Sequence, residues 1–169
     1  EITAYAQQMG FHTIERKPEL AQNTANGNDL LVHHYLQFPQ YDYYFQLFAT
    51  APYLQPETIK VCVEKLTGSE EYDSCFTATE NHGFYWLPNN PINYRPGILP
   101  RSQDMLAVVE ETTGLYGICR SSLERYRCRI GRKPYIHTVG KFEAVDINTE
   151  EDLEVAQYIG RVVWGYTAQ

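Results

Sequence analysis

The sequence has little cysteine, and no cysteine pair has the spacing of a metal or redox motif. Only four cysteines occur among 169 residues: Cys62, Cys75, Cys119 and Cys128. The absence of C-x-x-C and of cysteine–histidine clusters at zinc spacing argues against a structural zinc site. Cys62 and Cys75 lie within apolar runs and are predicted to be core thiols. Free thiols fit a reducing compartment, so we expect a cytoplasmic protein.

Long apolar runs and clusters of basic residues are also missing. No stretch approaches the roughly 20 apolar residues of a membrane span, so we expect no membrane partner. The net charge of −7, with lysine and arginine scattered, argues against nucleic acid as a partner. The five histidines show no H-E-x-x-H pattern. With 43% hydrophobic residues, the chain can form a core of its own, and its length predicts one domain over residues 1–169.

Helical and strand patterns alternate along the first half of the chain. The predicted helices cover residues 2–9, 29–37 and 56–66, and the predicted strands cover 11–14, 43–48 and 74–78. The polar segment 16–28, with Pro18, Asn23, Asn26 and Gly27, is predicted to be a loop. Strands separated by helices of this length imply a parallel sheet with helices on both faces. The predicted fold class is therefore α/β, a three-layer Rossmann-like fold with a mostly parallel sheet.

The second half begins with an irregular insert at residues 82–108, rich in proline, asparagine and tyrosine. Segments this long inside compact domains are usually functional or form an interface. Strands at 114–119, 135–139 and 144–147 and a short helix at 121–126 are predicted next. Thr149 and Asp152 then resemble a capping box that opens a last helix. The residues expected along one face of that helix are Leu153, Ala156, Ile159 and Val163.

Three places could carry chemistry, and each also has a simpler interpretation. Asp146 is expected at the carboxyl end of a strand, where ligands bind in open α/β sheets, and a carboxylate there can hold Mg²⁺. It could equally be a turn residue at a strand–helix junction. The small residues around Thr50 allow a ligand to approach the backbone, or they form an ordinary loop. Arg101 could bind a carboxylate in a bidentate manner, or it could be a surface charge.

Five segments, in this order, resemble motifs of the acylneuraminate cytidylyltransferase family. They are RKPELAQNTA at 16–25, ATAP at 49–52, RSQD at 101–104, TGLY at 113–116 and VDINTEED at 145–152. Their order and spacing are kept across nearly the whole chain. The ATAP form resembles the pseudaminic acid branch of the family. Each motif is weak alone, but the five together are fairly specific.

The resemblance implies the nucleotide-diphospho-sugar transferase version of the α/β fold and a definite reaction. The anomeric hydroxyl of a sialic-acid-like 2-keto sugar acid would attack the α-phosphate of CTP, and pyrophosphate would leave. Such a transfer depends on positioning and on neutralising phosphate charge. The resemblance further implies Mg²⁺ as cofactor and a homodimer. The insert at 82–108 would serve as the dimerisation and substrate arm.

The resemblance also assigns roles to individual residues. It implies that Arg16, Ala25, Asn26 and Gly27 bind the nucleotide. Sugar-acid binding falls on Thr50, Ala51, Arg101, Gln103, Gly114 and Tyr116, with Arg101 and Gln103 able to act in a partner subunit's site. Metal binding falls on Asp146 and Asn148. Asp146 and Arg101 are the expected catalytic residues.

Three departures from the family pattern keep other functions open. Asn148 replaces a second metal-binding aspartate, and Phe48 replaces a glutamine. The family's N-terminal nucleotide loop does not appear, so we expect an upstream segment of about 30 residues or more. A protein that began at Glu1 is expected to be inactive. The alternatives are a non-catalytic remnant that binds a nucleotide sugar or only dimerises, and a nucleotidyltransferase for another base or sugar, such as an octulosonate or a GDP-linked sugar.

Overall fold

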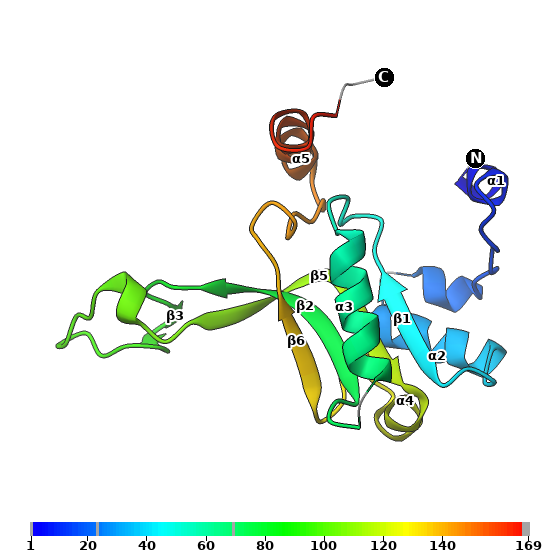
Figure 1. Ribbon diagram of the computed structural model, residues 1–169, viewed down its shortest axis with the longest axis horizontal. Helices are drawn as coiled ribbons and strands as arrows, with labels where there is room; N and C mark the ends of the chain where they lie inside the picture. Colours follow the sequence, from blue (N-terminus) through cyan, green and yellow to red (C-terminus); the bar gives the residue numbers. More distant parts are fainter. Residues whose placement is uncertain (1, 23, 69, 167–169) are drawn as a thin grey trace.

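The computed structural model describes residues 2–22, 24–68 and 70–166. A four-stranded sheet forms the centre of the molecule, with helices on both of its faces (Figure 1). The strand order is β1-β5-β2-β6. The strands are β1 (Tyr43–Leu47), β5 (Val108–Cys119), β2 (Ser74–Asn81) and β6 (Pro134–Thr138). The α/β fold class predicted from the sequence is confirmed.

Three of the four strands run in the same direction, as the prediction of a mostly parallel sheet requires. Strand β2 pairs with β6 in parallel, whereas β5 is antiparallel to both β1 and β2. The sequence analysis did not predict the reversed direction of β5. No crossover helix joins β2 to β5, so the chain returns along the same edge and pairs as a long hairpin does.

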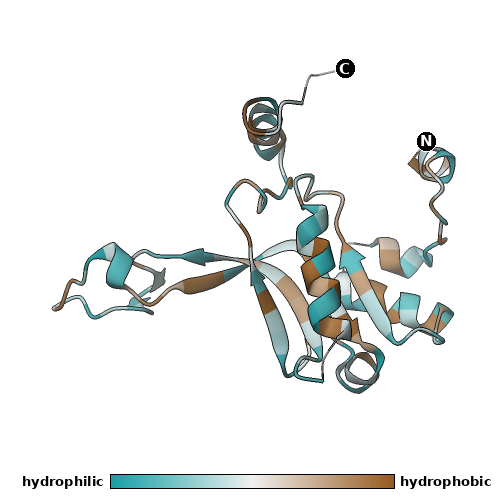
Figure 2. Cartoon of the chain, in the orientation of Figure 1, coloured by the Kyte–Doolittle hydropathy of each residue, from teal (hydrophilic) through white to brown (hydrophobic). Residues whose placement is uncertain are grey.

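Helices cover the sheet in two groups. Helix α3 (Pro56–Thr67) packs on one face, and helices α2 (Gly27–Gln37) and α4 (Arg120–Tyr126) pack on the other. The first face buries Cys62 and Leu66 of α3 against Cys75 and Leu115; the second buries Leu31 and Leu123 against Tyr44 and Ile118. Figure 2 shows hydrophobic and hydrophilic residues alternating along α3. The prediction of three layers, and of Cys62 and Cys75 as core thiols, is confirmed.

Most of the expected helix boundaries are also confirmed. Helix α1 covers Ile2–Gln8, a 3-10 turn η1 covers Pro18–Ala21, and α3 begins at Pro56. Helix α5 (Glu150–Val162) opens with the predicted capping box, in which Thr149 and Asp152 each bind the other's backbone amide. Of the four residues expected along its inner face, Ala156 is buried, but Leu153 and Val163 are 44% and 40% exposed.

Two predicted strands are wrong. Residues 11–14 form no strand, and Phe11 is exposed, because this segment has no neighbouring strand to pair with in the described chain. Residues 144–147 form a turn and an extended segment, in which Ile147 N donates a single backbone hydrogen bond to Thr50 O (2.9 Å). Two residues used above, Glu1 and Asn23, lie outside the described residues.

The insert forms an arm that projects away from the sheet (Figure 1). At its base, Ala78–Asn81 of β2 pair with Val108–Glu111 of β5. Beyond this ladder the arm holds the short strands β3 (Trp86–Leu87) and β4 (Asn90–Pro91) and the 3-10 turn η2 (Ser102–Asp104). Within the part of the chain that the structure describes, no helix has the length and apolar character needed to cross a membrane.

Candidate functional site

Asp146 lies in the segment between β6 and α5, next to a distorted point of β5. Its Oδ2 accepts hydrogen bonds from Thr113 Oγ1 (2.8 Å) and from Asn148 Nδ2 (2.9 Å). Its Oδ1 is buried and has no hydrogen-bond partner among the described residues. The carboxylate lines a depression of about 490 Å³ together with Glu111 and Lys141. Asp146 and Asn148, the pair expected to bind metal, are therefore brought together.

Thr113 holds its hydroxyl against Asp146 from an unusual backbone conformation. Its φ is 58°, in the left-handed region that β-branched residues rarely adopt. It lies where the β2–β5 pairing changes register, between Phe76 and Ala78 of the opposite strand. Such irregularities commonly redirect a side chain beside a functional site. Here the irregularity aims a hydroxyl donor at the carboxylate.

Burial raises the pKa of Asp146, but hydrogen bonding outweighs this effect. The side chains of Thr50, Thr113 and Asn148 and the backbone amide of Ile147 all stabilise the charged form, so the pKa lies below its ordinary value. Hydrogen bonds to a carboxylate favour ionisation in this way. Asp146 is therefore an anion at neutral pH, and its buried Oδ1 has no hydrogen-bond partner among the described residues.

The loop after β1 approaches the same place. Thr50 O accepts the amide hydrogen of Ile147, and Ala51 is buried. A side chain at Gly114 would begin 3.3 Å from Ala51 Cβ, so this loop packs directly on β5. The structure thus brings Thr50, Ala51 and Gly114 close to Asp146.

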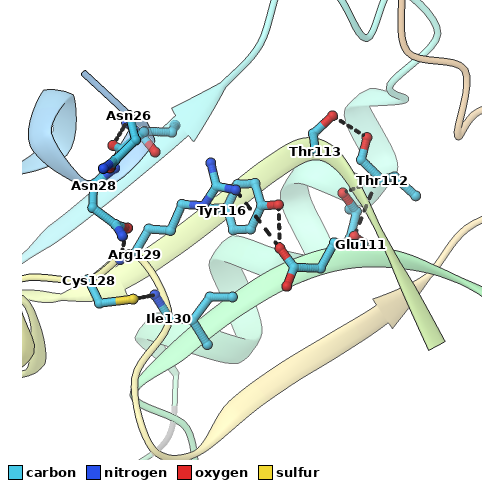
Figure 3. Close-up of polar contacts among 12 residues, drawn as sticks. Asn26, Asn28, Glu111, Thr112, Thr113, Tyr116, Cys128, Arg129 and Ile130 are labelled. Carbon is cyan, nitrogen blue, oxygen red and sulfur yellow. Dashed lines mark hydrogen bonds and ion pairs between the residues drawn. The ribbon is translucent and has the colours of Figure 1, made fainter. Parts of the chain in front are cut away.

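A second cluster, built around Arg129, lies on the α2 side of the sheet (Figure 3). The guanidinium carbon of Arg129 lies 3.6 Å from the centre of the Tyr116 ring. Tyr116 is 1% exposed, and its hydroxyl donates to Glu111 Oε2 (2.6 Å). Burial and this hydrogen bond raise the pKa of the tyrosine. Tyr116, expected to bind substrate, is instead mostly covered, and the group above it is Arg129.

The predicted nucleotide segment meets this cluster. Asn26 caps α2 by accepting hydrogen bonds from the amides of Asn28 (2.8 Å) and Asp29 (3.3 Å). Asn28 Oδ1 accepts the backbone amide of Arg129 (2.9 Å), as Figure 3 shows. Asn26 and Gly27 are therefore fixed close to Arg129.

Two other predicted nucleotide residues lie on the same side of the molecule. Ala25 N donates to Gln22 O (3.1 Å) in the turn just before α2. Arg16 lines a separate depression of about 450 Å³ with Gln46 and Phe48.

Arg101 and Gln103 lie in the arm. Arg101 pairs with the carboxylate of Asp104 (2.7 and 3.2 Å), and both side chains are largely exposed. Since the arm projects from the sheet, the chain does not bring these two residues into its own Asp146 depression (Figure 1). Their expected role in a partner subunit's site stays a prediction.

Sequence reasoning missed Glu111, Arg129 and Gln46. Glu111 stands beside Glu110 in a strand that was expected to begin only at residue 114. Arg129 lies in a short basic stretch, CRIGRK, with no motif to single it out. Gln46 interrupts an apolar strand run, YYFQLF, and a polar residue inside such a run was the one available signal.

Comparisons with known proteins agree with the motifs. The chain is 27% identical over 165 residues to N-acylneuraminate cytidylyltransferase A of Danio rerio, covering 93% of this chain and 38% of that protein. It is 26% identical over 165 residues to N-acylneuraminate cytidylyltransferase of Oncorhynchus mykiss, with the same coverage. The chain is thus similar in sequence to two N-acylneuraminate cytidylyltransferases over nearly its whole length. No protein-family model matches it.

A solved structure has a similar fold. CMP:2-keto-3-deoxy-manno-octonic acid synthetase, in complex with CTP, superposes with a TM-score of 0.61 at 14% identity. The superposition covers 94% of this chain and 76% of that one. The chain spans 38% of the length of the two curated relatives. The likeness to the pseudaminic acid branch stays a prediction.

Proposed function

We propose that the protein transfers CMP from CTP to the anomeric oxygen of an acidic 2-keto sugar, with release of pyrophosphate. The observation that carries the proposal is Asp146, an ionised carboxylate with one oxygen that has no hydrogen-bond partner in the described chain, beside the Thr50 loop and Gly114. The sequence likeness to N-acylneuraminate cytidylyltransferases supports the choice of nucleotide and of sugar class.

In this proposal the chain works by positioning its two substrates. Arg16, Ala25, Asn26 and Gly27 hold the nucleotide near the start of α2, where the helix dipole favours the negative charge of its phosphates. The anomeric hydroxyl of the sugar acid attacks the α-phosphorus while the bond to pyrophosphate breaks. The protein holds the two reactants in line and forms no covalent intermediate.

The residues around Asp146 fit Mg²⁺. Magnesium takes oxygen ligands, uses one or two carboxylates and keeps several waters, so a single aspartate can suffice. The unpartnered Asp146 Oδ1 offers such a ligand. The Asn148 side chain donates an Nδ2–H to Asp146, which leaves its amide oxygen as a second ligand. When bound, the ion would neutralise phosphate charge at this point.

Pyrophosphate release by the full-length protein tests the function. CTP should be used much faster than UTP, GTP or ATP, in the presence of N-acetylneuraminate, pseudaminate or 2-keto-3-deoxy-octulosonate as separate acceptors. Chelation of divalent cations with EDTA should stop the reaction, and added Mg²⁺ should restore it.

Asp146→Asn should lower kcat/KM by at least about 100-fold, because it removes the charge and a ligand of the ion. Asp42→Asn, at an exposed aspartate paired with Arg120, is the matched control and should leave kcat/KM unchanged. Equal rates with all four nucleotides would refute the cytidine assignment.

A second candidate function is non-catalytic binding of a nucleotide sugar. The observation that favours it is Asn148, whose neutral amide stands beside Asp146 where the family pattern has a second aspartate. Isothermal titration with CTP and with CMP-N-acetylneuraminate separates the two candidates. Binding of either ligand without any pyrophosphate release would favour this second function, and turnover would exclude it.

We further propose that the arm joins two copies of the chain. Its large apolar side chains are more than half exposed: Trp86, Leu87, Ile98, Leu99 and Leu106. Figure 2 shows hydrophobic residues at the far end of the arm. An apolar surface of this kind marks an interaction site. Light scattering should give a dimer mass, and Leu99→Asp should give the monomer mass; an unchanged monomer for both would refute the proposal.

A further inference from the structure

Two contacts fix the position of Arg129, one through its backbone amide and one through the flat face of its guanidinium. Its amide donates to Asn28 Oδ1 (2.9 Å), and its guanidinium lies over Tyr116 at 3.6 Å, with the Phe48 ring 5.9 Å away. Stacking on an aromatic face holds a guanidinium while leaving its edge, which carries the N–H groups, free. The side chain is 23% exposed. Arg129 is therefore pre-positioned rather than freely mobile.

The side-chain N–H groups of Arg129 have no carboxylate within hydrogen-bond distance in the described chain. The nearest carboxylate oxygen, Glu111 Oε2, is 3.9 Å from Nη2, which is too long for a hydrogen bond. That oxygen already accepts the Tyr116 hydroxyl at 2.6 Å. A stacked, partly buried guanidinium with open N–H groups is an arrangement that binds carboxylates and phosphates.

The space beside Arg129 lies over the N-terminus of α2. A Cβ atom at Gly27 would come within 2.6 Å of Arg129 Nη1 and 3.7 Å of Gln46 Oε1. Only the missing side chain of Gly27 lets the guanidinium lie this close to the first turn of the helix. The dipole of an α-helix favours an anion at this end.

Gln46 adds a hydrogen-bond acceptor without a partner at the same place. Its side chain is 9% exposed, and its Nε2 donates to Gly27 O (2.8 Å). A flipped amide would set two oxygens against each other, so this hydrogen bond fixes the direction of Oε1. Oε1 is buried without a hydrogen-bond partner in the described chain. A buried unpaired acceptor is costly unless a ligand supplies a donor.

From this geometry we propose that Arg129, Gln46 and the start of α2 form a ligand subsite for an oxyanion with a neighbouring hydroxyl group. Arg129 would bind the oxyanion, and the hydroxyl would donate to Gln46 Oε1. Two sources share this chemistry: the carboxylate and hydroxyls of a sugar acid, and the phosphate and ribose hydroxyls of a nucleotide. The inference rests on the proposed function, and it extends that site to residues outside the five motifs.

The subsite adjoins the Asp146 depression. Glu111 lines that depression, and its Oε2 lies 3.9 Å from Arg129 Nη2. Tyr116 contacts both residues, because its hydroxyl donates to Glu111 and its ring lies under the Arg129 guanidinium. One extended ligand could therefore contact the Asp146 edge and the Arg129 edge together. This continuity makes Arg129 a binding residue of the same site rather than of an unrelated patch.

The test uses the full-length protein, its Arg129→Gln and Arg129→Lys variants, and a matched control. Arg132→Gln removes the same charge from the same loop, but Arg132 is exposed and lies over Tyr126 instead. Isothermal titration would measure binding of N-acetylneuraminate, 2-keto-3-deoxy-octulosonate, the uncharged N-acetylmannosamine, CTP and CMP. Steady-state pyrophosphate release would give KM for sugar and for CTP separately. Circular dichroism would confirm that each variant is folded.

Loss of a charge-assisted hydrogen bond should weaken affinity for the bound oxyanion about ten- to hundred-fold in Arg129→Gln. Arg129→Lys should restore only part of it, because lysine lacks the planar fork. Weaker binding of the two sugar acids, with CTP, CMP and N-acetylmannosamine unchanged, supports the subsite and names the carboxylate as its ligand. Weaker binding of CTP and CMP alone supports it and names the phosphate.

Equal affinities in Arg129→Gln and Arg132→Gln for every probe would overturn the subsite. If the wild-type protein released no pyrophosphate, the proposed function would fail, but the titrations would still decide the subsite by themselves.

Discussion

Thr113 Oγ1 lies 2.8 Å from Asp146 Oδ2, and the threonine reaches this position with a φ of 58°. A left-handed β-branched residue costs about 1–3 kcal/mol of backbone strain. The irregularity in β5 is what brings the Thr113 hydroxyl to Asp146, which lies outside the paired strands. The strain and the carboxylate's hydrogen bond are two consequences of one local conformation.

Thr113→Val should destabilise the protein by about 1–3 kcal/mol, because it keeps the strained shape while removing a donor from a partly buried carboxylate. Thr113→Asn should be neutral or slightly stabilising, since asparagine tolerates positive φ and its amide can donate. Urea unfolding measures both. Thr138→Val, which removes an exposed hydrogen bond to Glu80, should stay within about 0.5 kcal/mol. An unchanged free energy of unfolding in Thr113→Val would mean that the hydroxyl does not stabilise Asp146.

Asp73 should make the fold sensitive to acid. Burial raises the pKa of Asp73. Hydrogen bonds from the amides of Arg132 and Lys133 and from the hydroxyls of Ser74 and Ser122 lower it by more, so the net shift is downward. A pKa that is lower in the folded state than in the unfolded one gives stability above about pH 4 that is lost as the pH falls.

Asp73→Asn should therefore cost about 2 kcal/mol at pH 7, and this cost should shrink as the pH falls below about 4. Urea unfolding of both proteins between pH 3 and 7 measures the difference. Asp146 and Asp152 also have lowered pKa values, so the variant keeps part of the acid sensitivity. A difference that is constant with pH would contradict the account.

Gly117→Ala should be destabilising because the added Cβ would come within 2.5 Å of the Phe45 ring and 2.7 Å of Cys75 Sγ. Overpacking of this kind typically costs about 1–3 kcal/mol. Gly140→Ala, where no atom lies within 4 Å of the added Cβ, is the control and should be nearly neutral. Thermal unfolding of the two variants compares them directly. Equal unfolding temperatures would show that the sheet shifts to accept the methyl group.

Thr149→Ala should lower stability by about 1 kcal/mol, because it removes the N-terminal cap of α5, where Thr149 Oγ1 accepts the amide of Asp152 at 3.2 Å. Thr67→Ala, at an exposed threonine whose hydroxyl donates to Val63 O, should change stability by less than about 0.5 kcal/mol. Circular dichroism during thermal unfolding measures both. Indistinguishable variants would mean that α5 frays without affecting the rest of the fold.

The elements best predicted from the sequence are those set by local signals. Pro56 opens α3, Gly68 ends it, and the Thr149–Asp152 pair opens α5, because proline geometry and capping hydrogen bonds act within a few residues. The failures at 11–14 and 144–147 have the opposite cause. Apolar residues of strand character form a strand only where another strand is available to pair with them.

The sequence alone was enough to predict the α/β class, most helix starts, the likeness to cytidylyltransferases and the closeness of Asp146 and Asn148, since these follow from local propensities and from motifs kept in order. Only the tertiary structure decided the direction of β5, the placement of Arg101 on a projecting arm and the meeting of Arg129, Gln46 and Gly27. The physical reason is distance along the chain: Gln46 and Arg129 belong to elements far apart in sequence, and they meet only because β1 and the loop before β6 both border the start of α2. No local pattern of residues encodes that contact.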